Sequence, residues 1–155
     1  MKNGFTTGTA ATAAAAAHAV FIATDFALNK VGVTLPDGEV LTIPVTCYDT
    51  HAVVVKDSGS DPDVTHNAEI HASVKLTTDG KIVIKAGTGI GIVTKAGLQI
   101  PVGQPAINPV PRQMIESNLR LILGDENGAE VTISVPNGEH LAEQTFNARL
   151  GIMGG

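Results

Sequence analysis

The chain of 155 residues is 43% hydrophobic and 16% charged, a composition that excludes an intrinsically disordered protein and favours one globular domain over two. The formal net charge of −5, with ten scattered Lys and Arg residues, one Tyr and no Trp, provides neither a basic stripe nor a stacking platform for nucleic acid. The lone Cys47 excludes an internal disulfide and no Cys/His spacing matches a zinc site, which indicates a reducing, cytoplasmic setting without a protein-bound metal.

The first predicted element is a helix in an alanine-rich run. Thr6, Thr7 and Thr9 stand at its start, and hydroxyl side chains of this kind commonly begin helices. We predict a helix over residues 9–25, centrally buried because small alanine side chains let other elements approach its axis. The run is too short and too weakly apolar to span a membrane, so no membrane partner is expected.

Strands dominate the middle of the chain. Residues 31–45 alternate apolar and polar around Pro36-Asp37-Gly38, which predicts a β-hairpin. Residues 52–55 form another predicted strand. Residues 70–76 and 81–85 predict a second hairpin, turning at Asp79-Gly80.

The last third of the chain mixes loop, helix and strand signals. Residues 87–111 are rich in Gly and Pro and predict a long loop. A helix follows over 111–123 and ends at Gly124, with one buried face formed by Met114, Ile115, Leu119 and Ile122. A strand over 131–135 and a short helix over 138–146 complete the elements. Their order predicts an α+β fold, with a mixed or antiparallel sheet, a buried alanine-rich amino-terminal helix and further helices packed on it.

Several loops carry residues suited to binding anions. Thr6, Thr7 and Thr9 offer hydroxyls and free N–H groups at a helix start, which can bind carboxylate or phosphate, although a plain helix cap explains them more simply. Arg112 places a bidentate carboxylate binder at the start of the later helix, with Asn108 just before it. Capping and packing are the alternative roles for these two residues.

Residues 56–69 gather four acidic side chains with Lys56 and His66. This density favours either a metal or acid/base site or a solvated surface turn, and the residues alone favour the turn. A calcium loop is excluded, because counting from Asp61 the sixth position is His66 rather than Gly.

The glycines of residues 87–91 do not form a cofactor fingerprint. The third glycine of a dinucleotide motif would fall at Ile92, and no Gly-Lys-Thr sequence closes a phosphate loop. Glycine here more simply lets backbone approach a bulky ligand or a helix. Thr94 and Lys95 follow, and Lys95 can pair with an anion, whereas His18 and His71 are expected to be satisfied core or surface residues.

Four blocks of sequence carry a resemblance to a known family. They are GFTTGT at 4–9, KDSGSDPDVTHNAEI at 56–70, GTGIGIVTKAGLQIPVGQPAINPVPRQMI at 87–115 and TFNARLGIMGG at 145–155. In this order they resemble the signature blocks of the CbiD-type cobalt-precorrin-5B C1-methyltransferases. The resemblance runs from end to end and is far more specific than any of the short motifs.

The resemblance implies methyl transfer from S-adenosylmethionine to C-1 of the cobalt-containing macrocycle during cobalamin synthesis, with cobalt present only as part of the substrate. The substrate's acetate and propionate groups suit helix amino termini, Lys and Arg. The implied substrate-binding residues are Thr6, Thr7, Thr9, Lys56, Thr94, Lys95, Asn108 and Arg112. Acidic residues bind carboxylates poorly, so acid/base or orienting roles are implied for Asp57, Asp63 and His66.

Two departures from the family pattern qualify these expectations. Family members usually carry Cys where this chain has Ala10. They also continue into a Rossmann-like region that this chain lacks, so residues 1–155 are expected to be a single amino-terminal, substrate-side domain, with the cofactor bound mainly elsewhere. The alternatives are a non-catalytic module that binds a corrinoid or another polyanion, and, less favoured, a phosphate-transferring enzyme. The oligomeric state stays open, a homo-oligomer included.

Overall fold

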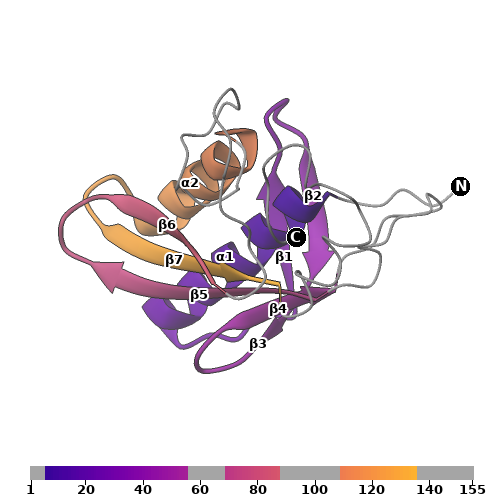
Figure 1. Ribbon diagram of the computed structural model, residues 1–155, viewed down its shortest axis with the longest axis horizontal. Helices are drawn as coiled ribbons and strands as arrows, with labels where there is room; N and C mark the ends of the chain where they lie inside the picture. The colour runs from indigo at the N-terminus through magenta and orange to yellow at the C-terminus, as the bar shows by residue number, and fades with distance from the viewer. Residues whose placement is uncertain (1–5, 56–68, 88–108, 136–155) are drawn as a thin grey trace, which may run out of the picture.

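The computed structural model describes residues 6–55, 69–87 and 109–135 (Figure 1). Within these residues the fold consists of two helices, a five-stranded sheet and a separate two-stranded hairpin. Helix α1 is central, because it packs against the five-stranded sheet, the hairpin and α2. The α+β class and the buried amino-terminal helix are confirmed.

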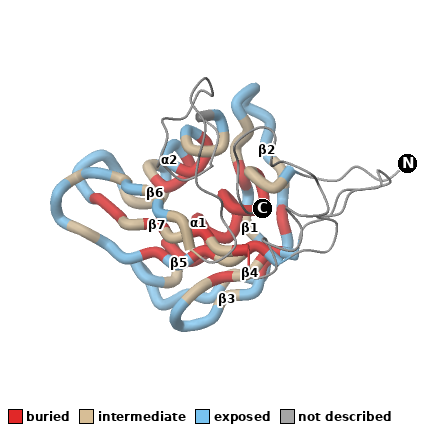
Figure 2. Tube along the Cα trace, viewed as in Figure 1, coloured by how far each residue is buried: buried red, intermediate tan, exposed pale blue. Residues whose placement is uncertain are grey.

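Helix α1 spans Thr7–Thr24, beginning two residues earlier than predicted. Thr6 caps it, its hydroxyl oxygen accepting a hydrogen bond from the Thr9 N–H at 3.0 Å. Asp25 ends it in a left-handed conformation, with φ at 63°. Every residue from 9 to 19 is buried, because the small side chains of this run let other elements pack closely around the helix (Figure 2).

The first predicted hairpin is confirmed. Strand β1 (Lys30–Thr34) pairs antiparallel with β2 (Val40–Pro44), and the chain turns between them with φ of 89° at Gly38. Val33 and Ile43 face inward and are buried, while the alternate positions are more exposed. The hairpin forms a sheet of its own.

The five-stranded sheet has the order β3-β4-β5-β7-β6. Its strands are β3 (Thr46–Cys47), β4 (Ala52–Val55), β5 (Glu69–Thr77), β6 (Ile82–Ala86) and β7 (Gly128–Ser134). Strand β4 has its predicted bounds, and β7 begins three residues before the predicted 131 and ends one residue before the predicted 135. The two-residue strand β3 is too short for the sequence pattern to predict.

The predicted second hairpin is wrong in its pairing. Both strands form, but β7 lies between them, antiparallel to β5 and parallel to β6. The turn signal is real, since Gly80 has φ of 74°, yet the turn joins strands that have another strand between them. Gly128 makes room for this arrangement, because a Cβ there would contact Thr77 and would lie 2.6 Å from the Lys81 carbonyl oxygen.

Helix α2 spans Pro109–Leu123, and Gly124 follows it with φ of 82°. The helix begins two residues earlier than predicted, which shortens the predicted loop. The predicted helix at 138–146 and most of that loop lie outside the described residues. The predicted inner face is confirmed by the burial of Met114, Ile115 and Leu119, with Ile122 packed at the edge of the core.

Candidate functional site

The candidate site lies at one end of the five-stranded sheet. Strands β4, β6 and β7 end there and β5 begins there, as the pairs Val55↔Glu69 and Ala86↔Ile133 show. Ligands of sheets with parallel strands commonly bind beyond the carboxyl ends of those strands. The segments that the structure does not describe are joined to the fold at this end, namely 56–68, 88–108 and 136–155.

Most of the predicted functional residues belong to segments whose described neighbours lie at this end of the sheet. Those that lie outside the described residues, so that their positions stay predictions, are Lys56, Asp57, Asp63, His66, Thr94, Lys95 and Asn108. Their flanking residues are described: Val55 and Glu69 form a cross-strand pair, and Gly87 donates its N–H to the Ile133 carbonyl at 2.7 Å. The fold thus brings Val55, Gly87 and Val135, which are far apart in the sequence, to the same end of the sheet.

Both helices also begin at this end. A short connection joins the end of α2 to the start of β7 at the opposite end of the sheet, so α2 runs antiparallel to β7. Its first turn meets the first turn of α1, since a Cβ on Gly8 would lie 2.9 Å from Cγ of Pro111. The positive ends of two helix dipoles therefore converge here, which favours a bound anion.

The described candidates Thr6, Thr7, Thr9 and Arg112 belong to these two first turns. Thr9 is buried, and its hydroxyl lies 3.0 Å from the hydroxyl of Thr6, so this pair helps to form the helix cap. Thr6 is exposed, while Thr7 and Arg112 are half-buried. These last three residues are the described candidates that reach the surface where the two helices start.

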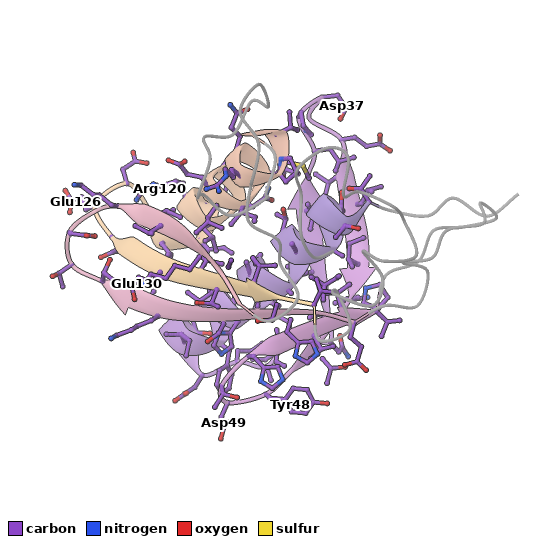
Figure 3. The ribbon with its side chains drawn as sticks, in the orientation of Figure 1. Asp37, Tyr48, Asp49, Arg120, Glu126 and Glu130 are labelled. Carbon is purple, nitrogen blue, oxygen red and sulfur yellow. The ribbon has the colours of Figure 1, made fainter. Side chains whose placement is uncertain are left out.

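At the opposite end of the sheet, Arg120 holds the loops together through hydrogen bonds, a role that no motif in the sequence predicts. Its guanidinium group donates hydrogen bonds to the carbonyls of Gly80, Gly124, Asp125 and Asn127. Figure 3 shows Arg120 on the same side of the molecule as Glu126, away from the tip of the first hairpin. Arg120 therefore joins the end of α2 to the β5–β6 connection, which is a structural role.

His18 is a satisfied core residue, as predicted. Its Nδ1 accepts a hydrogen bond from the Val74 N–H at 2.8 Å, and its Nε2 lies 3.2 Å from the Asp49 carbonyl oxygen. Burial lowers the pKa of His18, which keeps the ring neutral. His71 is a partly exposed surface residue paired with Glu69 at 2.9 Å.

The described residues hold no metal-binding cluster. Within 6–55, 69–87 and 109–135, no three His, Cys, Asp or Glu side chains gather closely enough to bind a metal ion. In the same ranges, neither helix is long and apolar enough to cross a membrane.

Comparison with known proteins places the chain in a family. The family model described as CbiD matches residues 1–155. The chain belongs to the CbiD family. It is 45% identical to a cobalt-precorrin-5B C(1)-methyltransferase of Moorella thermoacetica and 47% identical to one of Dechloromonas aromatica, over 100% and 99% of this chain.

The chain spans 43% and 42% of the length of those two CbiD relatives. A crystal structure of the cobalamin biosynthesis protein CbiD from Archaeoglobus fulgidus has the same fold, with a TM-score of 0.77 at 29% identity. That similarity covers 98% of this chain and 50% of the crystallised one. The family resemblance seen in the four sequence blocks is thereby confirmed.

Proposed function

We propose that this chain is the amino-terminal, substrate-side domain of an S-adenosylmethionine-dependent enzyme that methylates C-1 of cobalt-precorrin-5B during cobalamin synthesis. The observation that carries the proposal is the CbiD match over residues 1–155, together with relatives of that printed activity at 45% and 47% identity. The proposed substrate is a small tetrapyrrole that brings its own cobalt.

The convergent helix starts supply the binding chemistry. Carboxylates of the substrate accept hydrogen bonds from free N–H groups at a helix start, and the two dipoles favour their negative charge. Arg112 adds a planar donor that can hold one carboxylate through two parallel bonds, and Thr6 and Thr7 add hydroxyl donors. Further carboxylates of the substrate are proposed to be bound by side chains of the adjoining segments, namely Lys56, Thr94, Lys95 and Asn108.

Proton handling or orientation at the ring is proposed for Asp57, Asp63 and His66. The two ends of their segment are held together by the pairing of Val55 with Glu69, at the same end of the sheet as the helix starts. Carboxylates near a carboxylated substrate repel its side chains, which favours a role at the reacting ring over a role in binding.

Within the described residues, no short Gly-rich turn leads from a strand into a helix. A nucleotide-type cofactor usually lies against a short Gly-rich turn from a strand into a helix. Among the described elements, β6 is the strand that is followed by a helix, α2. The connection between them consists mainly of residues 88–108, which lie outside the described residues. S-adenosylmethionine is proposed to bind mainly outside this chain, in the further region that the family resemblance implies, and the steps assigned to this chain are binding and orienting the substrate.

Calorimetry on the 155-residue chain tests these roles. We expect it to bind a cobalt corrinoid with free acetate and propionate groups and to bind S-adenosylmethionine poorly. Cofactor binding without corrinoid binding would overturn the assignment. Corrinoid binding without turnover in the full-length enzyme would instead support the alternative, a non-catalytic corrinoid-binding module.

Variants of Arg112 sharpen the test. Arg112→Ala should weaken corrinoid binding by about 10- to 150-fold, corresponding to about 1.5–3 kcal/mol for a charged hydrogen bond. Arg112→Lys should restore it only in part, because a point charge replaces a two-pronged donor. Lys81→Ala, which removes a positive charge at the opposite end of the sheet, is the matched control and should bind like the wild type.

A further inference from the structure

His18 joins three elements of the fold. Strand β4 begins its pairing with β5 at Ala52, whereas β5 extends further past that point. Strand β4 does not run alongside this extension. Here the Val74 N–H donates a hydrogen bond to Nδ1 of His18. On its other side the ring contacts the carbonyl of Asp49 in the turn formed by residues 48–51, between β3 and β4.

These two contacts define the protonation state of the ring. A backbone N–H can only donate, so Nδ1 of His18 must be without a proton, and Nε2–H must donate to the Asp49 carbonyl. A second proton on Nδ1 would set two donors against each other and break the contact with Val74. The neutral ring is thus a condition of this junction.

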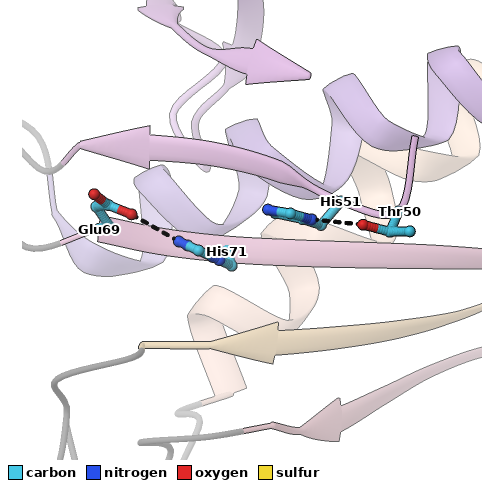
Figure 4. A network of polar contacts seen from close by, with 4 residues as sticks. All are labelled: Thr50, His51, Glu69 and His71. Atoms are coloured by element: carbon cyan, nitrogen blue, oxygen red, sulfur yellow. Dashed lines mark hydrogen bonds and ion pairs between the residues drawn. The ribbon is translucent and has the colours of Figure 1, made fainter. Parts of the chain in front are cut away.

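The same turn carries a second group of rings on the outer side of β4 and β5 (Figure 4). His51 stacks on Tyr48 and on His71, with ring centroids 5.0 Å apart in both pairs. Thr50 bonds to Nδ1 of His51 at 2.8 Å. Positive charge on His51 disfavours a second proton on His18 in the closed fold, which adds to the effect of burial on the pKa of His18.

The elements packed around His18 contribute few charges to it. Helix α1 has no other titratable residue. The titratable side chains on the β3–β4 turn and on β5 are Tyr48, Asp49, His51, Glu69, His71 and Lys75. Those on the other elements that contact α1, and at its end, are Asp25, Lys30, Cys47, Arg112, Glu116, Arg120 and Glu130. Of all these groups, His51 is the one whose charge acts on the pKa of His18.

We propose that His18 is an acid-sensitive latch, which holds the β3–β4 hairpin against β5 and α1 when neutral and releases that hairpin when it takes up a second proton. Strand β3 has two residues and β4 has four, so few backbone bonds retain them, whereas β7 pairs along its whole length with β5 and over residues 129–133 with β6. Because β4 ends at the candidate site, release of the β3–β4 hairpin makes the structure at that end of the sheet depend on pH.

The direction of the pH effect follows from linkage. Burial lowers the pKa of His18 in the closed state, so the open state binds the proton more readily. The latch is fully closed above the ordinary histidine pKa of about 6.5 and weakens as the pH falls below it. At pH 5.5 the opening equilibrium should rise by up to about tenfold, the limit that applies when the open state alone takes up the proton.

Amide hydrogen exchange at pH 7.5 and 5.5, corrected for intrinsic rates, tests the latch. Peptides covering residues 46–55 should open more at the lower pH, by up to about tenfold, with no such change in β7. In His18→Gln the side-chain amide offers one acceptor and one donor and does not titrate, so the acid response should vanish. His51→Gln is the matched control and should keep most of the response.

Two results would overturn the latch: an unchanged acid response in His18→Gln, or equal loss of protection in β7. If His18→Gln does not fold, nitrogen-detected NMR of the wild-type imidazoles decides the question. The latch requires the Nε2–H form of His18 at pH 7.5 and protonation only together with hairpin release. Protonation of His18 with the hairpin still protected would refute it.

Discussion

Asn118→Leu should destabilise the fold through one strand edge. The Asn118 side chain is buried and faces Thr34 of β1, accepting from its N–H at 2.9 Å and donating to its carbonyl at 3.1 Å. The Asn118 side chain thus makes the two hydrogen bonds that a neighbouring strand would make to Thr34, and it connects the β1–β2 hairpin to α2. Leucine has a similar volume but can make neither bond.

The magnitude follows from the two groups left without partners. An unsatisfied buried backbone group costs about 1–3 kcal/mol, and Thr34 is only half-buried, so we expect about 2–3 kcal/mol in total. For a chain of this size the melting temperature should fall by about 5–10 °C. The third bond of Asn118, to the Met114 carbonyl at 2.7 Å, adds little because that carbonyl lies within the helix.

Urea unfolding followed by circular dichroism measures the effect. Ser117→Ala is the matched control, because the Ser117 hydroxyl also donates to the Met114 carbonyl but has no bond to Thr34. We expect the control to change the free energy of unfolding by less than about 0.5 kcal/mol. If Asn118→Leu is as stable as that control, the strand-edge explanation is wrong.

Three further predictions concern other parts of the fold. Gly128→Ala should cost about 1–3 kcal/mol in urea unfolding, because the added Cβ meets the Lys81 carbonyl, and an unchanged midpoint would contradict the close packing. Arg120→Met should lower the melting temperature by a few degrees, since the carbonyls it binds are largely exposed, and no change would show that water replaces it fully. In a full-length CbiD enzyme, Asp63→Asn and His66→Ala should lower single-turnover methylation at an unchanged melting temperature; stable, fully active variants would remove this segment from the active site.

Local patterns are enough to predict most elements and the family. Helix propensity and capping depend on neighbouring residues, so the sequence predicts α1, α2 and the first hairpin within two residues at their ends. The four blocks likewise indicate the CbiD family, because a long ordered match does not require knowledge of contacts.

Tertiary structure alone decides which strands pair and which residues meet. The turn at Asp79-Gly80 looks the same whether β6 lies next to β5 or one strand away, and the choice depends on β7, which follows only after α2. The meeting of the two helix starts at Gly8 and Pro111 depends on the same crossover. Such contacts join residues far apart in the chain, and no local preference encodes them.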